Sequence, residues 1–176
     1  YHGDPRQNFT NAEWVRLSIK QHLELMEVSN TSEKTKITQL NLMLDNIKPD
    51  QNPLQYASTA TMLSTKLNNA GEYTRAEEMC RDCLEILPAE HKTAYGQLKA
   101  ALGVVLKQSG QVREGLNELS NAVDMITKDN PLLWVSVNKA LLRTQFLTEG
   151  TIPKPSKLEE IHEVLRTLCQ SDFGTT

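Results

Sequence analysis

Residues 63–88 read LSTKLNNAGEYTRAEEMCRDCLEILP, and the spacing of residue types in this stretch predicts the fold of the chain. Leu63 and Leu67 lie four residues apart and therefore share one face of a helix. Gly71 supplies the following turn, where a positive φ is often needed. Ala76 is small enough for a second helix to pack closely, and the final proline ends that helix. The stretch therefore predicts two helices joined by a tight turn.

The order of these residues resembles the tetratricopeptide repeat, whose signature runs W-x-x-L-G-x-x-Y, then A-x-x-x-F, then P, over about 34 residues. Residues 76–86 are similar to the second helix of kinesin-light-chain-type repeats, a longer-period branch of that family. The resemblance covers roughly residues 53–170 and is most specific for the first two repeats. It implies an all-α fold of about eight helices, arranged as a short right-handed superhelical solenoid of antiparallel helix pairs.

The chain also aligns with itself at a shift of 39 residues, which relates Tyr56, Tyr95 and Trp134. The same shift relates further apolar positions, namely Leu63 with Leu102 and Leu141, Cys80 with Leu119 and Leu158, and Leu87 with Ile126 and Leu165. We therefore predict three repeats, at about 53–90, 92–129 and 131–170. Because the shift exceeds the usual ~34 residues, the links between repeats are expected to be longer.

Apolar periodicity and breaker residues divide the chain into a flexible lead-in, an N-terminal helical pair, the repeats and a flexible tail. These parts are expected at residues 1–10, 11–49, 52–170 and 171–176. The helical pair lacks the signature glycine and alanine, so it is interpreted as a degenerate repeat or a cap. The helices are expected at about 11–28, 33–47, 53–69, 72–87, 92–108, 111–127, 131–148 and 157–170.

Three dipeptides or pairs are predicted to start helices. Asn52-Pro53 and Asn130-Pro131 each place a capping residue before a first-turn proline. Ser156 with Glu159 has the spacing of a capping box for the last helix, after a loop that contains two prolines.

The composition is typical of an ordinary soluble domain. The 176 residues carry a net charge of −3, which gives no general attraction to nucleic acid or to an anionic membrane. No apolar run approaches the ~18 residues of a membrane span. Three cysteines do not form a disulfide framework, so a reducing, cytoplasmic location is expected. Because the chain opens on Tyr1, we expect a fragment or a processed product.

Catalytic and metal-binding motifs are weak. Cys80-x-x-Cys83 has the spacing of a redox pair or half a zinc site, but it lies within a predicted helix and no second ligand pair follows. Packing in the core is the favoured interpretation, and Cys169 is expected to be packed or without a role. His162 is interpreted as a solvated helix residue. We find no phosphate-binding glycine loop or nucleophile elbow, so no enzyme activity, cofactor or metal is predicted.

A partner-binding groove is the stronger prediction. In stacked helical pairs the first helices line the concave face, and the 39-residue shift relates their outward positions in four rows. The rows are Ser58, Gln97 and Ser136; Thr61, Ala100 and Lys139; Thr65, Val104 and Arg143; and Asn68, Lys107 and Phe146. The predicted groove residues are Thr61, Thr65, Asn68, Gln97, Val104, Lys107, Lys139, Arg143 and Phe146. Solvated helix faces, on a scaffold that binds elsewhere, are the alternative interpretation.

The rows run from neutral to basic, which predicts the chemistry of the ligand. An extended peptide would present main-chain groups to Asn68 and Gln97 and an acidic or C-terminal carboxylate end to Lys139 and Arg143. These two cations match the third helix of the carboxylate clamp in chaperone-binding repeats. Other clamp positions hold different residues here, Val104 among them, so chaperone tails are not the expected ligand.

The sequence thus predicts a non-catalytic protein–protein interaction module that binds a peptide or a partner segment in a concave groove. Two alternative functions remain open. The first is a regulatory, peptide-sensing domain of a larger signalling protein. The second is a structural or oligomerisation segment of a longer helical solenoid.

Overall fold

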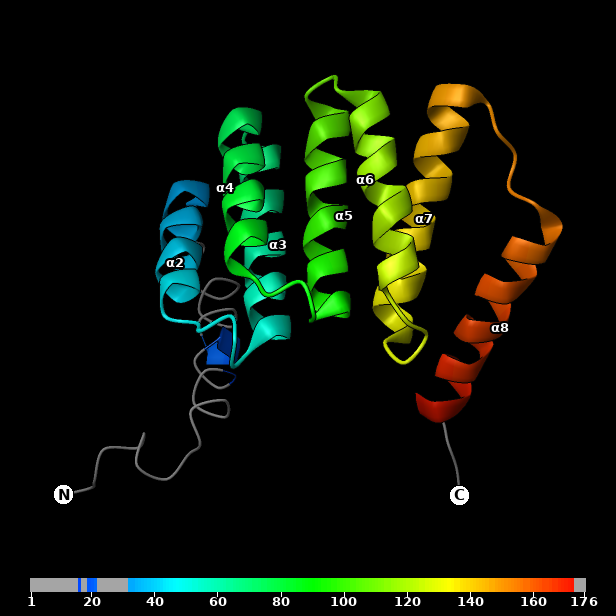
Figure 1. The fold of residues 1–176 in the computed structure, drawn as a ribbon, viewed down its shortest axis with the longest axis horizontal. Coiled ribbons are helices and arrows are strands. Elements are labelled where there is room, and N and C mark those ends of the chain that lie inside the picture. Colours follow the sequence, from blue (N-terminus) through cyan, green and yellow to red (C-terminus); the bar gives the residue numbers. More distant parts are fainter. Residues whose placement is uncertain (1–15, 17–18, 22–31, 173–176) are drawn as a thin grey trace.

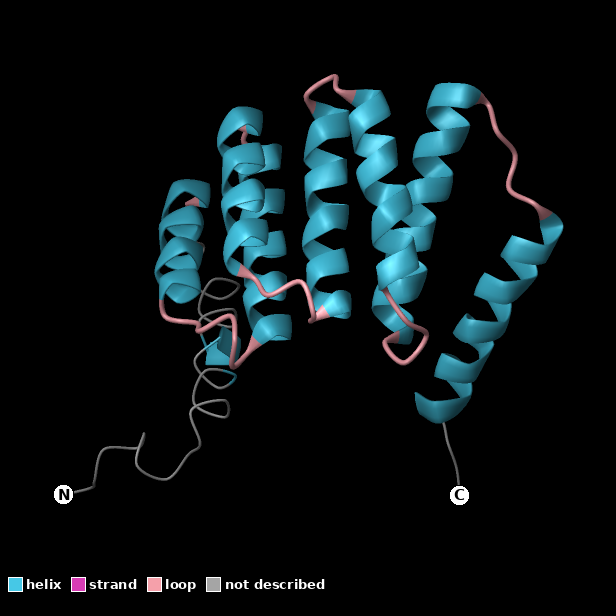
Figure 2. Ribbon diagram, viewed as in Figure 1, coloured by secondary structure: helices cyan, strands magenta, loops and turns pink. Residues whose placement is uncertain are grey.

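The computed structural model describes residues 16, 19–21 and 32–172. In this part of the chain it contains helices and loops and no strand (Figure 2). The all-helical prediction is therefore confirmed for the described residues. The predicted lead-in at 1–10 and most of the predicted helix at 11–28 lie outside them, as does the tail from residue 173.

Seven labelled helices follow one another along the described chain. They are α2 Glu33–Asp45, α3 Pro53–Asn69, α4 Tyr73–Ile86, α5 Lys92–Gln108, α6 Val112–Met125, α7 Pro131–Glu149 and α8 Pro155–Asp172. The starts and ends of α2 to α7 agree with the predicted helices within two residues. Asn52 and Asn130 stand before α3 and α7 as predicted, although neither side chain makes a capping hydrogen bond.

The predicted capping box of the last helix is wrong. α8 begins at Pro155, so Ser156 lies inside the helix and not at its cap. The N–H of Leu158 donates to the carbonyl oxygen of Lys154 at 3.2 Å, which closes the first turn. A proline at the first helical position fits because its φ is already helical and its missing N–H would have no partner there.

The helices form a row in which the chain reverses direction at every loop (Figure 1). α3, α5 and α7 contact one another in succession. α4 packs against both α3 and α5, and α6 packs against both α5 and α7. α2 packs on α3 at one end, and α8 packs on α7 at the other.

Two equivalent turns join the helices of the pairs α3–α4 and α5–α6. Gly71 and Gly110 adopt φ values of 78° and 94°, as the sequence predicted for Gly71. After α3 the N–H of Glu72 donates to the Leu67 carbonyl at 2.9 Å, and after α5 the N–H of Gln111 donates to the Leu106 carbonyl at 2.8 Å. This is the Schellman motif, which satisfies the last carbonyl groups of a helix and reverses the chain.

The core consists of three groups of buried residues, most of them aliphatic. One group joins α2, α3, α4 and α5, and a second joins α5, α6 and α7, with side chains of α8 at its edge. A third group joins Cys80 of α4 to Ala101, Leu102 and Leu106 of α5. Cys80 and Cys83 are 0% and 3% exposed, so their predicted place in the core is confirmed. No helix among the described residues combines the length and the hydropathy needed to cross a bilayer.

Charged residues around Trp134 hold α8 against the rest of the molecule. Glu160 of α8 accepts from Lys128 Nζ at 2.8 Å and lies 3.6 Å from Lys157 Nζ. Both ammonium groups face the ring of Trp134, at 5.4 Å and 4.8 Å from its centroid. The hydrogen bond from Lys128 is the main reason why the pKa of Glu160 lies below its usual value.

The backbones of α5 and α6 touch at two glycines. A Cβ atom on Gly103 would lie 2.9 Å from the carbonyl oxygen of Gly115 and 2.8 Å from Leu119 Cγ. A Cβ atom on Gly115 would lie 2.7 Å from the carbonyl oxygen of Gly103. These distances are below normal contact, so only glycine permits this approach of the two helices.

We expect the substitution Gly103→Ala to lower the free energy of unfolding by about 1–3 kcal/mol, because the new methyl group forces the helices apart. The higher helix propensity of alanine, which favours it over glycine by ~1 kcal/mol, acts in the opposite direction. Equilibrium unfolding in urea measures the difference. Asn117→Ala, at an exposed position of α6, is the control and is expected to stay within about 0.5 kcal/mol of the wild type. A Gly103→Ala protein as stable as the wild type would contradict the close contact.

Candidate functional site

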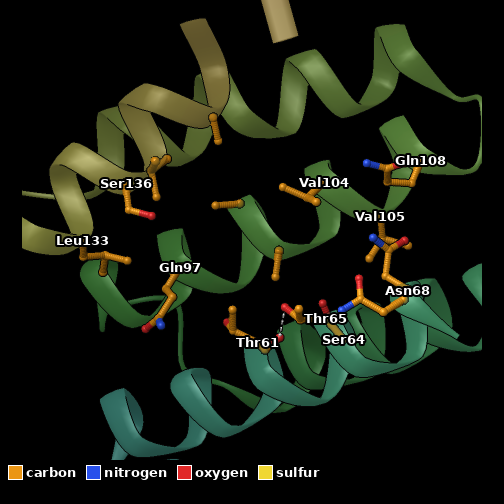
Figure 3. A pocket seen from close by; sticks show the side chains of 15 residues that line it. Thr61, Ser64, Thr65, Asn68, Gln97, Val104, Val105, Gln108, Leu133 and Ser136 are labelled. Carbon is orange, nitrogen blue, oxygen red and sulfur yellow. Dashed lines mark hydrogen bonds between the residues drawn. The ribbon is translucent and has the colours of Figure 1, made fainter. Parts of the chain in front are cut away.

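A cavity of about 430 Å³ lies between α3, α5 and α7 (Figure 3). α3 forms one side, α7 the opposite side, and α5 runs between them. The volume falls in the range of about 300–1,000 Å³ that is usual for ligand sites. The cavity is lined by α3, α5 and α7, which correspond to the first helices of the three predicted pairs. The sequence predicts a groove along these helices.

The structure brings five of the nine predicted groove residues to this cavity. They are Thr61, Thr65, Asn68, Gln97 and Val104. The other four do not line it: Lys107 is half-buried, and Lys139, Arg143 and Phe146 are exposed. Within the described residues, Lys139 and Arg143 form no ion pair.

Gln97, which lines the cavity, makes a direct contact with Ser58 of α3. Gln97 Nε2 donates to Ser58 Oγ at 3.3 Å, and the two residues stand 39 positions apart. They belong to the same predicted row, so equivalent positions of α3 and α5 face one another. The contact holds the Gln97 side chain at the edge of the cavity.

The threonine hydroxyl groups of α3 already use their hydrogens within the helix. Thr61 Oγ1 donates to the Ala57 carbonyl at 2.8 Å, and Thr65 Oγ1 donates to the Thr61 carbonyl at 2.9 Å, the dashed line in Figure 3. Each hydroxyl oxygen therefore keeps lone pairs that accept a hydrogen bond. Asn68 Oδ1 is a further acceptor, buried and without a hydrogen-bond partner among the described residues. Thr61, Thr65 and Asn68 thus place a row of acceptors on the α3 side, which Ser64 and Asn69 also line.

The α5 and α7 sides of the cavity are largely aliphatic, although Gln97, Gln108 and Ser136 also line them. α5 contributes Ala100 and Val104, and α7 contributes Leu133, Val137 and Ala140. Sequence analysis missed the three residues of α7, because it followed only the rows of outward positions. Their spacing of four and then three residues, which marks one face of a helix, was the available signal.

A second hollow, of about 470 Å³, lies between α2 and α4. Asp45, Glu78 and Asp82 stand around it, and Met79 and Ile86 contribute apolar surface. No group of three or more acidic, histidine or cysteine side chains suited to holding a metal ion occurs among the described residues. The α3–α5–α7 cavity is the better candidate because it unites equivalent positions of successive helices.

The thiols of α4 are poor nucleophiles. Burial raises the pKa of Cys80 to about 12, and burial also raises the pKa of Cys83. Both thiols are therefore protonated at neutral pH, when the thiolate is the reactive form. Cys169 is exposed, so of the two interpretations given for it, packing in the core is wrong. His162 is exposed, as predicted.

We expect one of the three cysteines to react rapidly with a thiol reagent at pH 8 in the native protein, and the other two only when the protein unfolds. The exposed Cys169 accounts for the fast reaction, and the buried pair is expected to react at least ~100-fold more slowly because the helix must open first. With a reagent that releases a coloured thiolate on reaction, absorbance measures the number of thiols that have reacted. Cys169→Ser is the control and removes the fast phase. Two or three fast thiols in the native protein would contradict the burial of Cys80 and Cys83.

Comparison of the chain with protein-family models, with curated proteins and with solved structures finds no match. What the structure defines is a class: a chain that is all-helical in its described residues and has an uncharged cavity between α3, α5 and α7. Its function is therefore argued from the residues of the cavity.

Proposed function

We propose that this chain is a non-catalytic protein-interaction module of the tetratricopeptide type, stacked as a short right-handed solenoid. It binds an extended segment of a partner protein in the cavity between α3, α5 and α7. The observation that carries the proposal is the cavity itself, which lies across first helices at positions related by the 39-residue shift. The succession of contacts α3–α5–α7, with α4 and α6 bridging them, supports the repeat arrangement.

The residues that line the cavity favour ligand binding over catalysis. The cavity presents hydroxyl oxygens, side-chain amides and aliphatic groups, and none of its lining residues ionises near neutral pH. A general acid or base needs a group that exchanges a proton in that range. The arrangement instead resembles a recognition site, in which apolar surface contributes affinity and a few polar groups set orientation.

Thr65 offers a way to block the cavity without disturbing the core, because its side chain is exposed and also lines the cavity. We expect Thr65→Trp to lower partner binding at least ~10-fold by filling the space that the segment occupies. The measurement is affinity capture from a cell lysate with quantitative mass spectrometry, followed by photocrosslinking of each captured partner from position 65.

Thr38→Trp is the matched control. Thr38 is also exposed in mid-helix, and its hydroxyl also donates to the carbonyl four residues earlier, at 3.0 Å. We expect this variant to retain every partner of the wild type. If Thr65→Trp captured the same partners as the wild type, or if no partner crosslinked from position 65, the cavity would not be the binding site.

A second candidate function is self-association through the α7–α8 end of the row. Large apolar side chains are exposed there: Phe146 at 55%, Leu147 at 61% and Ile152 at 78%, with Leu158 and Leu165 of α8 at 49% and 41%. Apolar surface gathered at one end of a molecule is a feature of interaction sites. This observation favours a structural or oligomerisation role alongside peptide binding.

If that end associates, the wild type will form a dimer or larger species as its concentration rises over about a hundredfold range. Leu158→Glu/Leu165→Glu should then remain monomeric, because four-carbon apolar groups are replaced by charges that would have to be desolvated. Sedimentation velocity distinguishes the two proteins. Concentration-independent sedimentation of the wild type as a monomer would rule out this second function.

A further inference from the structure

The cavity combines three properties that together limit what it accepts. Its α3 side carries acceptors, namely the hydroxyl oxygens of Thr61 and Thr65, whose hydrogens are already donated to carbonyls of α3, and Asn68 Oδ1, which has no hydrogen-bond partner among the described residues. Its α5 and α7 sides are largely aliphatic, and their polar lining residues are Gln97, Gln108 and Ser136. Finally, not one of its lining residues is charged.

The hydrogen-bond acceptors on the α3 side favour a ligand that carries hydrogen-bond donors. A buried acceptor without a partner costs free energy until a donor reaches it, so Asn68 Oδ1 favours a ligand that brings an N–H group. The main-chain N–H groups of an extended peptide are donors that every residue except proline carries.

The aliphatic walls and the absence of charge among the lining residues disfavour an ionised ligand in the cavity. A carboxylate or ammonium group that entered would lose its water without gaining a counter-charge. Small aliphatic side chains instead gain by contact with Val104, Val137 and Ala140. Lys139 and Arg143, the predicted anion site, do not line the cavity.

The length of the acceptor row sets the length of the ligand segment. Thr61 and Asn68 are seven residues apart on α3, which corresponds to about 10 Å along the helix axis. An extended chain advances about 3.3 Å per residue. The row therefore matches about three residues of extended chain.

We infer that the cavity binds about three consecutive uncharged residues of an extended partner segment, whose main-chain N–H groups donate to α3 and whose small aliphatic side chains contact α5 and α7. The inference rests on the proposed function, because it describes the ligand of the same cavity. It replaces recognition of an acidic end by recognition of an uncharged aliphatic segment.

The experiment is a selection from a displayed library of random dodecapeptides. Clones are kept when they bind the wild type and Thr38→Trp but not Thr65→Trp. We expect these cavity-dependent clones to share a window of uncharged aliphatic residues. Titration calorimetry with the synthetic peptides should show a dissociation constant that changes less than about twofold between about 0.1 M and 0.5 M NaCl, since screening acts on charged contacts.

Two modifications test the donor and the apolar contacts separately. N-methylation of one amide within the window removes a donor and should weaken binding about 3–10-fold, whereas N-methylation outside the window should not. Val104→Asp introduces a charge into the aliphatic wall and should weaken binding at least ~10-fold. Thermal unfolding of Val104→Asp checks that it is folded, and if it is not, the N-methylated peptides alone decide the question.

Charge reversal separates this inference from the proposed function. Lys139→Glu/Arg143→Glu should leave the affinity of the selected peptides within about threefold. The control Arg113→Glu/Lys154→Glu should do the same, because it makes the same charge change at exposed positions that do not line the cavity and form no ion pair with another described residue. Cavity-dependent clones rich in Asp and Glu, lost with the first variant and kept with the second, would overturn the inference and leave the proposed function standing. A selection that returned no cavity-dependent clone would overturn both.

Discussion

The contact between the backbones of α5 and α6 is the constraint on which the rest of the structure depends. Gly103 and Gly115 bring the two helices closer than any side chain would allow. α5 also contacts α3, α4 and α7, so its position determines the positions of four neighbours. Because packed helices move as rigid elements, a shift at this contact would change the spacing of α3 and α7 across the cavity.

The cavity exists because α5 carries small side chains where it faces the space between its neighbours. Ala100, Ala101 and Val104 leave room that α3 and α7, with mostly polar or short side chains at the same level, do not fill. The end of the row formed by α7 and α8 has a different surface. There α8 is held by Glu160 and the cations around Trp134, while Leu158 and Leu165 remain exposed. One molecule thus offers a neutral hollow in its middle and an apolar surface at its end.

Local signals predicted the helices well. Turns at Gly71 and Gly110 and starts at Pro53 and Pro131 could be identified because each depends on a few neighbouring residues, whose backbone preferences are strong. The cap at Ser156 was misplaced because two prolines were interpreted as excluding a helix, although the second prefers the first helical position. The burial of Cys80 could be predicted because the 39-residue shift relates it to the apolar Leu119.

The sequence by itself determined, within two residues, where α2 to α7 begin and end, and it determined where the chain turns at Gly71. Its 39-residue shift also related Ser58 to Gln97, which contact each other. The tertiary structure decided which of the outward positions enclose a cavity. Thr61 and Val104 do so and Arg143 does not, although all three were predicted for one groove. The reason is physical: an enclosed space depends on how closely three helices, distant in sequence, approach one another, and that distance is the summed result of every side chain packed between them.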